Sequence, residues 1–149
     1  MVENKLVFER ISEKDDIFML LNIFKDTLKS LNQGDEKQME IAEKLSRFAC
    51  VIALKCEGDT LAFAAFYVND SVTQIAYISY IAVLPECQGK GYGGMVFSEI
   101  EKISKQCGMK KLRLEVNKSN VSAQKLYQKR GMSYESKASA DNIYMSKEI

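Results

Sequence analysis

The residues best suited to bind a ligand form a glycine-rich run in the second half of the chain. It reads Gln88-Gly89-Lys90-Gly91-Tyr92-Gly93-Gly94 and lies between an apolar, strand-like segment and an amphipathic helical segment. Glycines permit sharp turns and let several backbone N–H groups approach a ligand, and the N-terminus of the following helix adds partial positive charge. The run therefore predicts a site for a phosphate or diphosphate group.

Other nucleotide-binding motifs match this run in part. Gly89, Gly91 and Gly94 follow the G-x-G-x-x-G pattern of nicotinamide-dinucleotide domains, and Glu115 lies about 20 residues farther on, as that pattern expects. That motif normally follows the first strand of a domain, whereas here hairpin-like strands come first. A magnesium-binding P-loop fits less well, because Gly91 stands where a serine or threonine is required. A purely structural glycine turn is the remaining alternative.

The residue types available for acid–base and metal chemistry are limited. Histidine is absent, which removes the most common general base and every imidazole-dependent triad or metal site. A base must then be a carboxylate, a tyrosine or water. Cys50, Cys56, Cys87 and Cys107 contain no C-x-x-C pair, so we expect reduced, buried thiols and no metal. Cys87 adjoins the glycine run, but no evident base accompanies it to activate a nucleophile.

Hydrophobic periodicity predicts the elements that precede the glycine run. Residues 5–10 are typical of a short strand, and apolar residues recur at helical spacing over 17–31 and again over 41–48. Short apolar runs at 50–56 and 61–68, separated by a glycine between acidic residues, predict an antiparallel hairpin.

The second half alternates between strands and helices. Apolar residues fall on both faces of the segment 74–84, which predicts a covered central strand that ends at Pro85. The later elements are predicted as a helix over 96–107 capped by Gly108, a strand at 112–116, a short helix at 123–127, and strands near 132–135 and 143–145. We therefore predict a single α/β domain over residues 1–149, of the mixed α+β kind, with a mostly antiparallel central sheet.

Composition restricts the classes of partner. Hydrophobic residues make up 46% and charged residues 28% of the 149 residues, as in ordinary globular domains. A formal charge of +1 provides no broad positive field for nucleic acid. The chain has no apolar signal segment and no run of about 18 apolar residues, so we expect no membrane partner and a cytoplasmic location.

The glycine run and its surroundings resemble the GNAT superfamily of acetyl-CoA-dependent N-acetyltransferases. Residues 88–93 fit the family's Q/R-x-x-G-x-G/A loop, which grips the diphosphate of acetyl-CoA, and residues 81–85 lead into it as in the family. A later cluster is similar to a second family motif, with Met132 in place of its usual aromatic residue. Its members are Leu114, Glu115, Val116, Asn120, Ala123, Leu126, Tyr127, Gly131 and Met132. The resemblance is close over about residues 75–135.

The resemblance implies a cofactor site. GNAT domains have about four helices around a sheet that splays between its fourth and fifth strands, and the pantetheine arm lies in the wedge like an added strand. The residues implicated in binding acetyl-CoA are Ile81, Ala82, Val83, the seven residues of the glycine run, and Asn120. Purely structural roles are the alternatives, in the core for 81–83 and as a helix cap for Asn120.

The resemblance also implies direct acetyl transfer to an amine, with no metal and no covalent enzyme intermediate. Tyr127 matches the family's tyrosine that protonates the departing thiolate; its alternative role is that of a core aromatic. A strand N–H, which we assign to Val83, would polarise the thioester carbonyl.

The proton acceptor departs from the family pattern. Many members carry a glutamate on the central strand, whereas this strand has Tyr77-Ile78-Ser79-Tyr80. An alkyl ammonium with a pKa near 10 must lose a proton before it attacks. We expect Ser79 or Tyr80 to order a water chain that carries this proton to solvent, with Glu115 as the alternative.

The expected acceptor is a primary amine of a small molecule, with an amino sugar as the specific case. A peptide or protein amine is the main alternative, and a non-catalytic acyl-CoA-binding module is another, since the family glutamate is missing. A homodimer is compatible with the sequence, which does not determine the oligomeric state.

Overall fold

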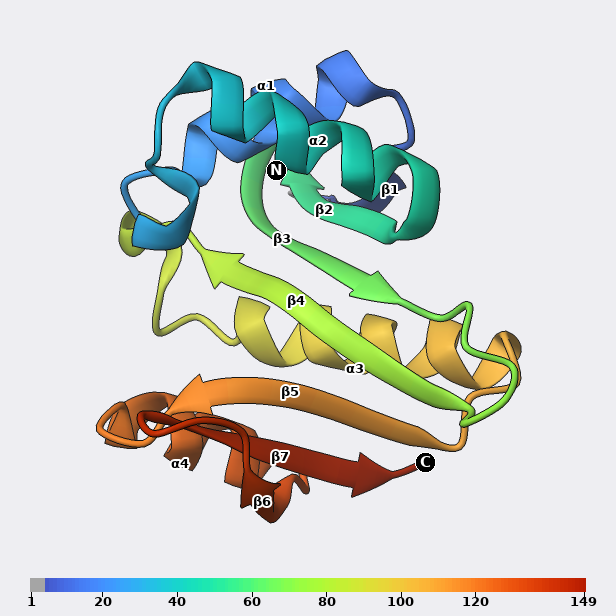
Figure 1. The fold of residues 1–149 in the computed structure, drawn as a ribbon. Coiled ribbons are helices and arrows are strands. Elements are labelled where there is room, and N and C mark those ends of the chain that lie inside the picture. Colours follow the sequence, from blue (N-terminus) through green and yellow to red (C-terminus); the bar gives the residue numbers. More distant parts are fainter. Residues whose placement is uncertain (1–4) are drawn as a thin grey trace.

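A seven-stranded sheet forms the middle layer of the computed structural model, which describes residues 5–149 (Figure 1). The strand order is β1-β2-β3-β4-β5-β7-β6, and neighbours are antiparallel except for the parallel pair β4 and β5. The elements follow the chain as β1 (Leu6–Arg10), α1 (Lys14–Phe24), the 3₁₀ turn η1 (Lys29–Leu31), α2 (Asp35–Phe48), β2 (Cys50–Cys56), β3 (Asp59–Tyr67), β4 (Ile75–Val83), the 3₁₀ turn η2 (Pro85–Cys87), α3 (Tyr92–Gln106), β5 (Lys111–Asn117), α4 (Val121–Lys129), β6 (Ser133–Lys137) and β7 (Asn142–Glu148). The mixed α/β architecture, with four α-helices in this part of the chain, confirms the predicted fold class.

Two hydrophobic cores lie on opposite faces of the sheet. Helices α1 and α2 cover one face, over the β1–β3 half, and α3 and α4 lie on the other (Figure 1). Successive residues of a strand point to opposite faces, so Val51 and Ala53 pack toward α1 and α2, while Ile52 and Leu54 pack toward α3. Because both faces are covered, β2 to β4 are apolar at nearly every position.

The hairpin between β2 and β3 forms where the sequence predicts it. Glu57 and Gly58 both have positive φ angles, of 52° and 86°, and Cys56 pairs with Asp59 across the turn. Positive φ at both central residues is the geometry that matches the twist of paired strands.

The fourth and fifth strands separate after a short ladder. Only Ile75–Ile78 of β4 pair with Lys111–Leu114 of β5, although β4 continues to Val83 and β5 to Asn117. Figure 1 shows the ends of the two strands diverging. The ladder between β3 and β4 is irregular at the same level, because Ala65 pairs with Tyr80 but Phe66 with Ile78, which leaves Ser79 as a bulge.

This topology contradicts the dinucleotide-domain alternative. Such a domain has a parallel, doubly wound sheet with its glycine motif after the first strand. Here β4 is the fourth strand, and the three before it form antiparallel pairs.

Some sequence predictions were wrong in detail. The first helical stripe was expected to run to Leu31, but α1 ends at Phe24, where the N–H groups of Thr27 and Leu28 both donate to the Phe24 carbonyl and close a turn. The four cysteines are free as expected, and Cys50 and Cys87 are buried, but Cys107 is exposed because it caps the outer end of α3. Across residues 5–149, none of the helices has the length and apolarity needed to cross a membrane.

Candidate functional site

The glycine run forms a cradle of free backbone N–H groups at the start of α3. Gly89 and Gly91 have φ angles of 80° and 85°, which L-residues with a side chain rarely adopt, and Gly91 is the N-cap of the helix. Within residues 5–149, none of the N–H groups of residues 89–94 donates a hydrogen bond to another group. Free N–H groups at the positive end of a helix suit an anion.

This cradle lines a cavity of about 530 Å³, a size typical of small-molecule sites. The residues that line it come from the end of β4, the glycine run, Leu28 and one face of α4. Of the residues predicted to bind acetyl-CoA, the structure brings together Ile81, Ala82, Val83, Gln88, Gly89, Gly91, Tyr92, Gly93, Gly94 and Asn120 around this cavity. Lys90 is exposed and does not line it.

The unpaired part of β4 forms the wall of the cavity. Beyond Ile78 its edge toward β5 has no strand partner, so backbone groups there are available to an amide-bearing ligand. The Gln88 side chain helps to hold this wall, because its Nε2 donates to the carbonyl oxygen of Val83 at 3.1 Å. A cradle of free N–H groups and an open strand edge in the same cavity fit the diphosphate and the pantetheine arm of acetyl-CoA.

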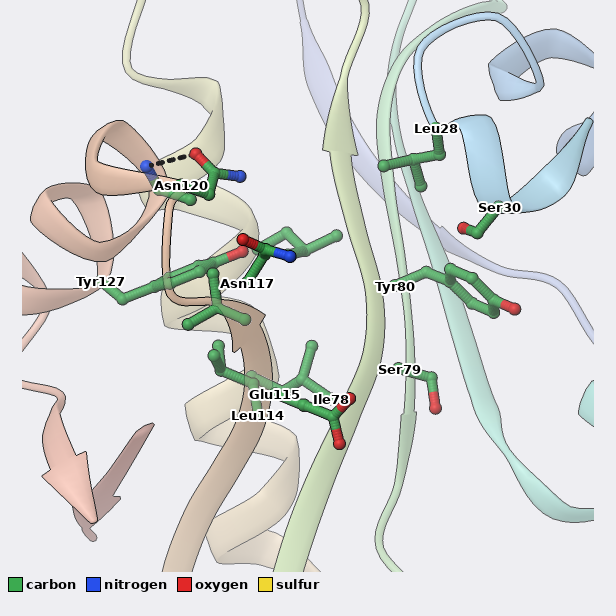
Figure 2. Close-up of a pocket in the computed structure, with 13 residues that line it drawn as sticks. Leu28, Ser30, Ile78, Ser79, Tyr80, Leu114, Glu115, Asn117, Asn120 and Tyr127 are labelled. Carbon is green, nitrogen blue, oxygen red and sulfur yellow. Dashed lines mark hydrogen bonds between the residues drawn. The ribbon is translucent and has the colours of Figure 1, made fainter. Parts of the chain in front are cut away.

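A second cavity, of about 220 Å³, opens at the point where the strands separate (Figure 2). It shares Leu28, Ile81, Asn120, Ala123 and Tyr127 with the larger cavity. Its polar lining comes from Ser30, Ser79, Tyr80, Glu115, Asn117, Asn120 and Tyr127. The gap between β4 and β5 beyond Ile78 and Leu114, called the wedge below, therefore connects the larger cavity with this smaller polar cavity, called the chamber.

Tyr127 lies at the junction of the two cavities. Figure 2 shows its side chain extending from α4 into the gap between the strands. Burial raises the pKa of its hydroxyl, so the group stays protonated at neutral pH. The hydroxyl has no hydrogen-bond partner among the described residues, which leaves it available to a ligand.

Asn120 combines a structural contact with a free donor. Its Oδ1 accepts from the backbone N–H of Ala123 at 3.2 Å, which caps α4 (Figure 2). Its Nδ2 makes no hydrogen bond within the part of the chain that the structure describes. Both predicted roles are thus geometrically compatible.

The candidate proton acceptors line the smaller cavity from different sides. Figure 2 shows the Tyr80 side chain pointing away from Tyr127, on the side of β4 where Leu28 and Ser30 lie, and its ring stacks on Phe63 at a centroid distance of 6.4 Å. Burial raises the pKa of the Tyr80 hydroxyl, which keeps it neutral. A neutral tyrosine at this place is suited to ordering water rather than to removing a proton.

Glu115 supplies the only carboxylate that lines either of these two cavities in the described chain. Its Oε2 accepts from Asn142 Nδ2 at 2.7 Å, which orients the carboxylate from the neighbouring strand β7. Glu115 lies one residue beyond the β4–β5 ladder, where the strands begin to diverge.

Several lining residues were missed by the sequence reasoning, among them Leu28, Ser30, Asn117 and Arg130. Leu28 and Ser30 line the smaller cavity because α1 ends at Phe24, before the end of its apolar stripe. No residue type near Leu28 or Ser30 predicts this early end of the helix. Asn117 is the last residue of β5 and Arg130 directly follows α4, so their positions at element ends were the only available clue.

Comparisons with known proteins agree with this geometry. The model of the acetyltransferase (GNAT) family matches residues 17–132. A search of curated proteins gave no significant match.

Several solved structures share the fold. The ribosomal-protein-S18-alanine N-acetyltransferase from Escherichia coli is 21% identical with a TM-score of 0.78, covering 97% of this chain and 94% of that one. An acetyltransferase from Thermus thermophilus is 14% identical with a TM-score of 0.80, covering 97% of each chain. The PaiA N-acetyltransferase from Thermoplasma acidophilum, solved in complex with coenzyme A, is 19% identical with a TM-score of 0.76, covering 97% and 99%. Because the family model spans most of the sequence and the fold agrees, the chain belongs to the GNAT family and is an acyltransferase.

Proposed function

We propose that this enzyme transfers an acetyl group directly from acetyl-CoA to a primary amine of a small molecule. The observation that carries the proposal is the junction of the two cavities at the wedge, with Tyr127 between them. The larger cavity has the phosphate cradle and strand edge that acetyl-CoA requires, and the smaller one is a polar chamber for the acceptor.

The proposed chemistry assigns one task to each group of this chain. Bound acetyl-CoA supplies an acyl group activated as a thioester. A backbone N–H of the 81–83 segment donates to the carbonyl oxygen as negative charge develops. Val83 was the sequence-based choice, but Ile81 is the residue of this segment that also lines the chamber shared with Tyr127. Tyr127 gives its proton to the departing sulfur.

The amine's proton leaves through the polar side of the smaller cavity. Ser79, at the bulge, and Tyr80 hold a water that relays the proton, and Glu115, whose negative charge attracts the ammonium form, accepts it. This division suits the chemistry, because both tyrosines are kept neutral by burial and only Glu115 is a carboxylate.

The chamber favours a small, cationic acceptor. Its volume of about 220 Å³ is below the usual range of drug-sized sites, about 300–1,000 Å³. Its one charged lining residue is Glu115, and no lysine or arginine of the described chain lines it. An ammonium group is therefore accommodated, whereas an acceptor whose carboxylate must enter the chamber is not.

A turnover assay separates this proposal from its alternatives. Free CoA thiol is measured with a panel of amino sugars, other small amines and short peptides, and products are weighed by mass spectrometry. Acetylation of small amines supports the proposal. Acetylation of peptides alone would assign a peptide amine as acceptor, and tight CoA binding without turnover would indicate a binding module.

The proton route is tested by variants at the three polar residues. Glu115→Gln is expected to lower kcat about 100-fold near neutral pH, the lower range for loss of a general base, with Glu148→Gln as a control on an exposed carboxylate. Tyr80→Phe and Ser79→Ala are expected to lower kcat less, because water can partly replace one hydroxyl. Full activity of Tyr80→Phe would remove Tyr80 from this route.

A further inference from the structure

Arg130 places a guanidinium group directly on the phosphate cradle, although it follows α4 and lies outside the glycine run. A Cβ atom built on Gly94 would overlap this guanidinium, including its Nη1 at 2.8 Å. Gly94 is buried in the first turn of α3 and has no positive φ, so its backbone does not require glycine. The missing side chain at position 94 instead makes the space that the arginine occupies.

The guanidinium has no counter-charge in the described chain. It forms no ion pair and no hydrogen bond there, and its Nε is buried without a partner. It also lies at the positive end of α3, beside the free N–H groups of residues 89–94. A cation held there is unfavourable in isolation, and an anion between the guanidinium and these N–H groups would satisfy both.

Arg130 lies between the larger cavity and the protein surface, where the phosphates of a ligand bound in the cavity would pass. Arg130 lines the larger cavity together with Gly91, Gly93 and Gly94, and it also lines a shallow hollow on the outer side of α3. A ligand that leaves the cavity toward this hollow passes the guanidinium beside the cradle. Glu99 and Lys102 line the hollow, but neither forms an ion pair with Arg130.

We propose that Arg130 binds the diphosphate of the acyl-CoA co-substrate together with the neighbouring backbone N–H groups of residues 89–94. This inference rests on the proposed function, since it assigns a further residue to the same site. The planar guanidinium can donate two parallel hydrogen bonds to phosphate oxygens, which a lysine cannot reproduce.

Isothermal titration of the ligand-free protein with CoA and with dephospho-CoA, which lacks the 3′-phosphate, tests the assignment. Arg130→Gln is expected to raise the Kd of both ligands by the same factor, about 10- to 100-fold, as for loss of charge-assisted hydrogen bonds. Lys129→Gln removes an equal charge from the adjacent exposed residue and is expected to change either Kd by less than about twofold. Arg130→Lys is expected to give an intermediate loss, and it carries the test if the Gln variant does not fold.

Two results would overturn the assignment. An affinity loss confined to CoA would mean that Arg130 contacts the 3′-phosphate, and a loss no larger than that of Lys129→Gln would mean that it contacts no phosphate. Failure of the unaltered protein to bind either ligand would instead refute the proposed function itself, so the two failures are distinguishable.

Discussion

Replacing Tyr127 by phenylalanine removes one hydroxyl at the junction of the two cavities and leaves the ring in place. The hydroxyl makes no hydrogen bond within the described residues, so the free energy of unfolding should change by no more than about 0.5 kcal/mol. The ring still packs beside the core under α3 and α4. Any large effect on turnover is therefore expected to come from chemistry rather than from folding.

The expected loss of activity follows from the general-acid role proposed for Tyr127. Removing a general acid typically costs 10²- to 10⁴-fold in rate. A thiol with a pKa near 8.5 is already a fair leaving group as the thiolate, so we expect about a 100-fold fall in kcat, or about 2.7 kcal/mol in the activation free energy. The Kd for CoA should change little, because the proposed task of the hydroxyl is to protonate the departing sulfur rather than to hold the bound co-substrate.

The measurement is CoA release by Tyr127→Phe over a range of pH, with Tyr134→Phe, an exposed tyrosine on β6, as the matched control. Because burial raises the pKa of Tyr127 above its usual value, its proton is still present at about pH 9, and the deficit should stay constant from about pH 6 to 9. A kcat within threefold of the unaltered enzyme would refute the general-acid role. A loss seen only in the Kd for CoA would mean that the hydroxyl binds the co-substrate and is not the general acid.

Three further outcomes are expected. Asn120→Ala should lower the free energy of unfolding by about 1 kcal/mol in urea, through loss of the α4 cap; an unchanged midpoint would contradict that role. CoA should slow amide exchange over residues 121–129, because α4 buries none of its residues and one of its faces lines the cavity; equal exchange with and without CoA would contradict this. Glu135→Gln should destabilise the protein by on the order of 1 kcal/mol at neutral pH. Burial raises the pKa of Glu135, but hydrogen bonds and charges from Arg113 and Lys111 outweigh it and lower the pKa, so this difference should disappear as pH falls below about 4. An equal difference at pH 3 and 7 would refute it.

The wedge links the two faces of the sheet. Tyr127 packs with the core under α3 and α4, while Tyr80 packs with the core under α1 and α2. Where β4 and β5 are paired, the sheet separates these two environments, but beyond Ile78 no strand pairing joins β4 to β5 within residues 5–149. In the reaction proposed above, the co-substrate and the acceptor would approach the junction from opposite sides, which is the arrangement that direct transfer requires.

Much of the fold was predictable because its causes are local. The hairpin at Glu57 and Gly58, the capped end of α3 at Gly108 and the glycine cradle all depend on residues that tolerate positive φ, and such preferences are visible in sequence. Periodicity placed the central strand at β4, since only a strand covered on both faces is apolar on both. The Asn120 cap was likewise local, because its partner is three residues away.

Other features depend on which segments meet in space. The end of α1 at Phe24, which brings Leu28 and Ser30 to the chamber, contradicts an apolar stripe that continues to Leu31. Nothing in the sequence marks Ser79 as a bulge at the level of the splay, because that depends on the register between β3 and β4.

The sequence by itself determined the element order, the cradle and the family motifs, since each depends on residues a few positions apart. Only the tertiary structure decided that Asn142 on β7 donates a hydrogen bond to Glu115 on the neighbouring strand β5. It likewise decided that the guanidinium of Arg130, after α4, lies against Gly94 of α3. Such meetings depend on strand order, register and helix packing, so the side chains that complete the site are determined by the whole fold.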